Sequence, residues 1–130
     1  MLAGAVACAA VSSSPAISAD AAATTYATVP PNAYSVVARI RAKPGMEDAL
    51  RAITLPLIQQ VRSDPKNLVY FLQEDRESTG HFIFYEVFAT QEDFEAHNNQ
   101  PYVKEWFAKL PELALGGVEV TKMKILVADR

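Results

Sequence analysis

The chain of 130 residues has little cysteine and no long hydrophobic run. Cys8 is its only cysteine, so removal of the N-terminal segment that contains it would exclude disulfides, thiolate metal sites and cysteine nucleophiles together. No glycine-rich phosphate loop follows a predicted strand, and no stretch approaches the roughly 20 consecutive apolar residues that a membrane-spanning helix needs. The chemistry has to come from other side chains.

Positive charge is also scarce. The 12 basic residues are outnumbered by 15 acidic ones, which gives a net charge of -3, and they are scattered without a run of like charges. The phosphate-neutralising surface that dominates nucleic-acid affinity is therefore missing, and we exclude nucleic acid as a partner. The length fits one domain.

Residues 1–19 contain no charged side chain and consist mainly of alanine, serine, valine and glycine. An apolar run followed by small residues is typical of a secretory signal, although the basic residues that normally precede the run are absent. A lipid anchor on Cys8 and a disordered alanine-rich leader are the alternatives. We expect a periplasmic or secreted protein, or a cytoplasmic one if the leader does not function. Residues 20–33, with Pro30 and Pro31, are typical of a flexible linker.

The folded unit is expected over residues 34–130, with an apolar pattern that alternates between strand and helix periodicity. The predicted strands are 34–42, 67–76, 81–89 and 118–127. The predicted helices are 46–62, kinked near Pro56, then 90–99, and a segment from Pro101 that Gly116 and Gly117 end. This β-α-β-β-α-β order predicts an α+β, ferredoxin-like fold in which an antiparallel four-stranded sheet carries its helices on one face.

The central hairpin is apolar on both of its faces. Phe82 and Phe84 alternate with Ile83 and Tyr85, for example, along the second of its strands. Helices cover only one face of such a sheet, and an aromatic second face exposed to water favours association. We therefore expect a homodimer in which two sheets close into an α+β barrel.

Three sequence segments resemble the antibiotic biosynthesis monooxygenase domain family. They are Arg39–Gly45 (RIRAKPG), Tyr85–Phe88 (YEVF), and Phe94–His97 (FEAH) followed by Pro101–Trp106 (PYVKEW). The resemblance covers about residues 34–127, and the segment from His97 to Lys104 is similar to small quinol monooxygenases and to an isomerase of a phosphorylated signalling-molecule breakdown product. The family's shared fold, a dimeric α+β barrel, does not select among these activities.

The resemblance also bears on cofactors. The haem-degrading branch of the family uses an asparagine, a tryptophan and an axial histidine, and these positions align with Ala38, His97 and Phe107. All three residues differ, which argues against haem. The resemblance then implies catalysis without a cofactor or a metal, in which a deprotonated electron-rich aromatic gives an electron directly to oxygen and the protein supplies a base and a dry pocket.

His97 and Glu86 are the candidate catalytic residues. A histidine titrates near pH 6.5 and accepts a phenolic proton at neutral pH, but His97 could instead bond the carbonyls freed where its helix ends. Glu86 lies between Phe84 and Phe88 on a strand, so burial should raise its pKa or make it pair. The partner could be His97, Arg39 or Lys104.

Aromatic residues supply the candidate substrate pocket. A flat substrate would suit a pocket lined by aromatic side chains, although core packing is the simpler explanation for any single one of them. Arg39 could hold a substrate oxyanion or face water at the barrel rim. The candidate substrate-binding residues are Arg39, Tyr70, Phe84, Phe88, Tyr102 and Trp106.

Three functions follow from these residues. The first is a cofactor-independent monooxygenase of a quinol or a similar aromatic, which uses oxygen as its second substrate. The second is a non-catalytic dimeric barrel that binds a small aromatic ligand. The third is an isomerase of a small phosphorylated metabolite, which export would separate from cytosolic substrates.

Overall fold

The computed structural model describes residues 29–126. The segment expected as a signal, 1–19, and most of the expected linker lie outside these residues. The strands are β1 (Tyr34–Ala42), β2 (Asn67–Glu74), β3 (His81–Phe88) and β4 (Ala114–Lys124). The helices are α2 (Glu47–Thr54), α3 (Leu57–Arg62), α4 (Gln91–Asn98) and α5 (Pro101–Leu113). Within the described part, no helix has the length and apolar character needed to cross a membrane.

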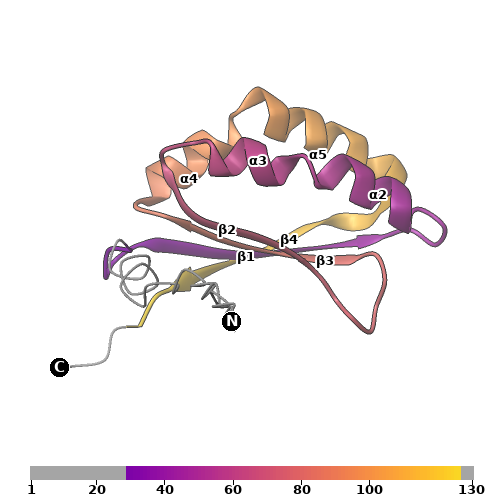
Figure 1. The fold of residues 1–130 in the computed structure, drawn as a ribbon, viewed down its shortest axis with the longest axis horizontal. Coiled ribbons are helices and arrows are strands. Elements are labelled where there is room, and N and C mark those ends of the chain that lie inside the picture. The colour runs from indigo at the N-terminus through magenta and orange to yellow at the C-terminus, as the bar shows by residue number, and fades with distance from the viewer. Residues whose placement is uncertain (1–28, 127–130) are drawn as a thin grey trace, which may run out of the picture.

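The strands form one antiparallel sheet in the order β2-β3-β1-β4, and the helices all lie on one side of it (Figure 1). This arrangement confirms the predicted α+β, ferredoxin-like fold. The central strands are β3 and β1. The helices α4 and α5 connect β3 to the edge strand β4. The edges of the sheet are β2 and β4.

Pro56 divides the predicted first helix into α2 and α3. A proline inside a helix lacks the N–H that would bond the preceding turn, and its ring crowds the carbonyl there. Here α2 ends at Thr54 and α3 begins at Leu57, with Leu55 and Pro56 between them, so the expected kink divides the helix in two. The break lets α3 place Leu57 and Val61 against the sheet as buried residues.

The last helix and the last strand meet earlier than expected. We predicted that Gly116 and Gly117 end the helix, but α5 ends at Leu113 and both glycines lie inside β4. The pairing of β1 with β4 shifts register between Arg39 and Arg41, and Gly116 has a φ of 67°. The glycines therefore accommodate a β-bulge, a role that also favours glycine, and the prediction of the helix end was wrong.

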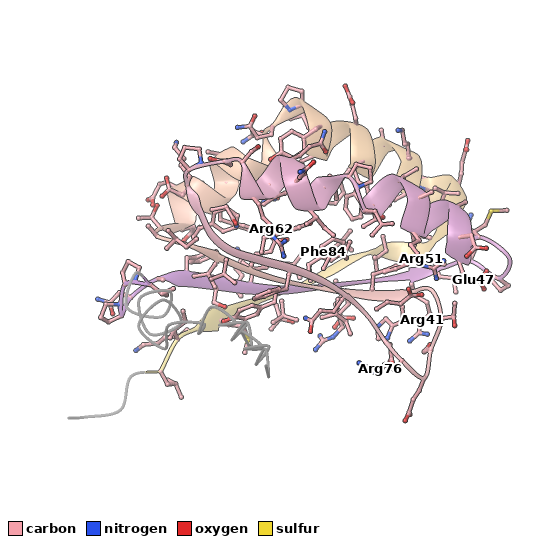
Figure 2. The ribbon with its side chains drawn as sticks, in the orientation of Figure 1. Arg41, Glu47, Arg51, Arg62, Arg76 and Phe84 are labelled. Carbon is pink, nitrogen blue, oxygen red and sulfur yellow. The ribbon has the colours of Figure 1, made fainter. Side chains whose placement is uncertain are left out.

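The sheet has two chemically different faces. Its inner face, towards the helices, carries Ala38, Tyr70, Phe84 and their neighbours, which form the main core cluster with Trp106. Its outer face carries the residues between them, including Phe71 and Arg41. Figure 2 shows Phe84 between the sheet and the helices and Arg41 on the opposite side. The described helices leave the outer face uncovered.

Candidate functional site

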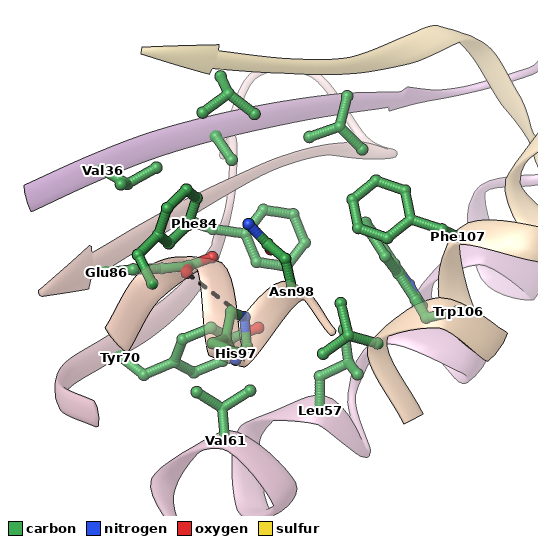
Figure 3. Close-up of a pocket in the computed structure, with 15 residues that line it drawn as sticks. Val36, Leu57, Val61, Tyr70, Phe84, Glu86, His97, Asn98, Trp106 and Phe107 are labelled. Carbon is green, nitrogen blue, oxygen red and sulfur yellow. Dashed lines mark ion pairs between the residues drawn. The ribbon is translucent and has the colours of Figure 1, made fainter. Parts of the chain in front are cut away.

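A pocket that is partly open to solvent lies between the inner face and the helices α3, α4 and α5. Most of its wall is apolar and comes from every layer of the fold (Figure 3). Polar groups enter it from only a few residues. The lining residues used below are Tyr70, Phe84, Glu86, His97, Asn98, Trp106 and Phe107.

Glu86 is a buried acid in the wall of this pocket. Successive side chains of a strand point to opposite faces, so Glu86 shares the inner face of β3 with Phe84 and Phe88 and lies beside the cross-strand residues Val36 and Tyr70. Its side chain is 9% exposed. Loss of water around the carboxylate raises the pKa of Glu86 to about 7. The group therefore changes charge close to neutral pH.

His97 lies in the last turn of α4 and is also buried. Its ring packs against Phe88 and Phe94, with centroid separations of 5.2 and 6.4 Å. Burial lowers the pKa of His97, and the carboxylate of Asp64 partly opposes that effect. The imidazole is therefore neutral at pH 7 and can accept a proton.

The two groups face each other. The Nε2 atom of His97 and the Oε2 atom of Glu86 are 3.7 Å apart (Figure 3). Among the described residues, neither Glu86 Oε2 nor His97 Nδ1 has a hydrogen-bond partner. A buried polar atom without a partner is unfavourable, and such atoms are concentrated at sites that bind ligands or move protons. Glu86 Oε2 and His97 Nδ1 are therefore the candidate atoms for such a role.

The alternative structural roles of both residues are taken by others. The carbonyl of Glu95, freed where α4 ends, accepts a hydrogen bond from the Asn99 side chain at 3.0 Å, so the helix end does not use the His97 ring. Arg39, one of the expected partners of Glu86, instead lies 3.8 Å from Glu119. The structure therefore places the Glu86 and His97 side chains together, which is one of the pairings that the sequence left open.

Three of the predicted substrate-binding aromatics line the pocket: Tyr70, Phe84 and Trp106. The Phe84 and Trp106 rings meet edge to face with centroids 5.6 Å apart. The indole Nε1–H donates to the hydroxyl of Thr54 at 3.0 Å, which fixes the orientation of Trp106. These residues belong to the core and to the pocket wall at once.

The structure does not bring the other three predicted residues into the pocket. Arg39 lies on the outer face, since its neighbour Ala38 faces the helices. Phe88 packs behind the site with Val36 and Phe94. Tyr102 stands beside the His97 ring, with centroids 6.5 Å apart, and its hydroxyl is buried with no hydrogen-bond partner among the described residues.

Asn98 and Phe107 also line the pocket, although the sequence did not identify them as site residues. Asn98 follows His97 directly, and Figure 3 shows its amide extending over the pocket between Glu86 and Phe107. Phe107 is an exposed aromatic residue of α5. A polar residue adjacent to a candidate base was the signal that could have identified Asn98.

The chain is similar in sequence to a known family and to a known protein. The family model for antibiotic biosynthesis monooxygenase matches residues 33–109. An uncharacterised protein of Synechocystis, sll1783, is 29% identical over 90 residues, which is 69% of this chain, and the aligned part spans 61% of that relative's length.

Solved structures share the fold. Rv0793 from Mycobacterium tuberculosis superimposes with a TM-score of 0.68 at 24% identity, covering 75% of this chain and 99% of that one. PA3566 from Pseudomonas aeruginosa gives a TM-score of 0.68 at 25% identity, covering 74% and 96%. SO0527 from Shewanella oneidensis gives 0.66 at 25% identity, covering 76% and 98%. The match of the family model to more than half of its length shows that the chain belongs to the antibiotic biosynthesis monooxygenase family.

Proposed function

We propose that the protein is a cofactor-independent monooxygenase that oxidises a quinol or a related electron-rich aromatic with molecular oxygen. The observation that carries the proposal is the buried Glu86–His97 pair in the wall of a pocket lined by aromatic rings. Membership of a family described as monooxygenases supports it.

The proposed reaction begins with a proton transfer. The neutral His97 imidazole accepts a phenolic proton, and an ionised Glu86 stabilises the imidazolium that forms. The phenolate gives one electron to oxygen, the resulting radical pair combines to a peroxide anion, and the imidazolium returns its proton to this anion to give a hydroperoxide. Loss of water from the hydroperoxide leaves a hydroxyquinone, so one oxygen atom enters the product and the other becomes water. All the electrons come from the substrate, and the protein needs no redox group.

The composition of the pocket wall favours a neutral substrate. None of the described lining residues is a lysine or an arginine. Phosphorylated ligands are normally held by such cations or by helix N-termini, so the wall does not favour the isomerase of a phosphorylated metabolite. An apolar wall with one polar end suits a flat aromatic that carries its oxygen atoms towards Glu86 and His97.

Oxygen uptake tests the proposal. The wild type and His97→Ala are assayed in an oxygen electrode with a panel of hydroquinones, and uptake without protein is subtracted. We expect catalysed uptake with at least one hydroquinone and a loss of about a hundredfold or more in the variant, the usual worth of a general base. His81→Ala is the matched control, because the other histidine of the chain bonds Asp75 at 3.2 Å on the outer face.

The alternative is a non-catalytic barrel that binds aromatics. Hydroquinone binding without uptake above background, unchanged in His97→Ala, would establish that function and exclude the monooxygenase.

We also propose that the protein is a homodimer that packs its two outer faces together. Phe71, Leu115 and Met123 are exposed apolar side chains on this face. Arg39 and Glu119 lie beside one another on the same face, so a two-fold related copy meets both signs of charge. A second copy is thus a complementary partner for it.

A further inference from the structure

Asn98 is a polar pocket residue to which the fold gives no other task. Its neighbour Asn99 donates its side-chain amide to the Glu95 carbonyl and thereby caps α4. No hydrogen bond joins the Asn98 amide to another described residue. The side chain is half-buried and lies among apolar neighbours such as Phe84 and Phe107 (Figure 3).

The position of Asn98 complements the Glu86–His97 pair. Both Asn98 and His97 end α4 and line the pocket, so one helix terminus presents an imidazole and an amide to the same space. An amide both donates and accepts hydrogen bonds. It can therefore bind a hydroxyl group before oxidation and a carbonyl oxygen after it, without changing its own charge.

We propose that Asn98 positions the substrate by hydrogen-bonding a second ring oxygen while the first lies at Glu86 and His97. The inference rests on the proposed function, because it assumes an oxygenated aromatic in the pocket. A site built to bond a hydroxyl discriminates against analogues that lack it, since its own buried polar group is then left without a partner. The pocket accordingly selects aromatics with two oxygen substituents over those with one.

The test is a pair of ligands that differ by one hydroxyl. Binding of 1,4-dihydroxynaphthalene and of 1-naphthol is measured by isothermal titration calorimetry without oxygen, so that no turnover occurs. The wild type should bind the diol about tenfold more tightly, the usual worth of one neutral hydrogen bond. Asn98→Leu, which keeps the size of the side chain, should bind both ligands alike, whereas Asn99→Leu should retain the preference.

Other outcomes overturn the inference. A preference for the diol that survives in Asn98→Leu, or one that is absent from the wild type, contradicts it, and so does a failure of both ligands to bind. If Asn98→Leu does not fold, Asn98→Ala also removes the amide and provides the same comparison with a smaller side chain. Oxygen uptake separates the two proposals: uptake with an unaltered ligand preference in Asn98→Leu removes only the role of Asn98. A lost preference without uptake in any assay removes only the oxygenase.

Discussion

At the scale of single residues, burial rather than pairing controls the chemistry of the site. The 3.7 Å between Glu86 and His97 is longer than a strong hydrogen bond, and loss of water changes the two pKa values in opposite directions. Both changes favour the neutral forms. Burial therefore favours a protonated carboxyl group beside an uncharged imidazole.

Glu86→Gln should change how stability depends on pH. The pKa of Glu86 rises from 4.5 to about 7 on folding, so the folded state binds the proton more tightly and loses stability as pH rises through this window. The glutamine variant does not lose that stability. We expect the free energy of unfolding of Glu86→Gln, relative to that of the wild type, to rise by about 3 kcal/mol between pH 4 and pH 8.5. Urea unfolding across this pH range measures it. A difference that is constant with pH would contradict the burial of this carboxyl group.

Thr54→Val should destabilise the fold through Trp106. Thr54 is fully buried; its hydroxyl donates to the Leu50 carbonyl at 2.6 Å and accepts from the indole. Valine keeps the shape but leaves the indole N–H without an acceptor, which costs about 1 to 3 kcal/mol. Urea unfolding measures the loss, and Thr54→Ser, which keeps the hydroxyl, is the control for that bond. Equal stability of valine variant and wild type would show that the bond contributes nothing.

At the scale of elements, the turn between β2 and β3 is tied to α2. Gly80 has a φ of 82°, and its N–H donates to Glu74, whose carboxylate also accepts from Arg51 of α2 at 2.6 and 2.9 Å. Arg51 in turn lies over the Phe82 ring. The hairpin, the helix and the inner face are thereby held in one arrangement at the end of the sheet distant from His97.

Gly80→Ala should therefore be more destabilising than Gly45→Ala. Both glycines have a left-handed φ, but a Cβ at Gly80 would lie 2.9 Å from the Ala42 Cβ and 2.7 Å from the Glu47 Cγ, whereas nothing lies within 4 Å at Gly45. We expect a loss of about 1 kcal/mol at Gly45, from backbone strain alone, and about 2 to 4 kcal/mol at Gly80. Thermal or urea unfolding of the two variants side by side measures the difference. Equal losses would show that the turn adjusts freely.

At the scale of the whole molecule, one layer of helices and one sheet leave the outer face without a cover. That face is a feature of the fold class, because both crossovers place their helices on the same side. Edge strands and exposed aromatics together favour association. The dimer proposed above would bury this face and leave the pocket, which lies on the other side of the sheet, to each subunit.

Phe71→Lys should convert a dimer into a monomer. Phe71 is 52% exposed on the outer face, and a lysine there would place a charge in the interface of both copies. Leu55→Lys is the matched control, because Leu55 is 50% exposed on the helical side. Light scattering after gel filtration should give a dimer for the wild type and for Leu55→Lys. A monomeric wild type at micromolar concentration would exclude the dimer.

Much of this molecule could be predicted from the order of its residues. Most element bounds follow from the apolar periodicity, from Pro56 and from Thr90, because these signals act over a few residues. The Thr90 side chain, for example, accepts a hydrogen bond from the Asp93 N–H and caps α4. Gly116 and Gly117 were misplaced because a bulge and a helix end favour the same residue type. Which one applies depends on the pairing of β4 with β1.

The candidate site could likewise be predicted only in part from the sequence. The sequence by itself determined that Glu86 points to one face of a hydrophobic strand and that His97 ends a helix, because strand alternation and helix capping are local. Only the tertiary structure decided that these groups meet at 3.7 Å, that Arg39 lies on the far face, and that Asn98 joins the pocket. Strand order and the packing of α4 on β3 set those relations, and both arise from contacts between residues distant in the chain.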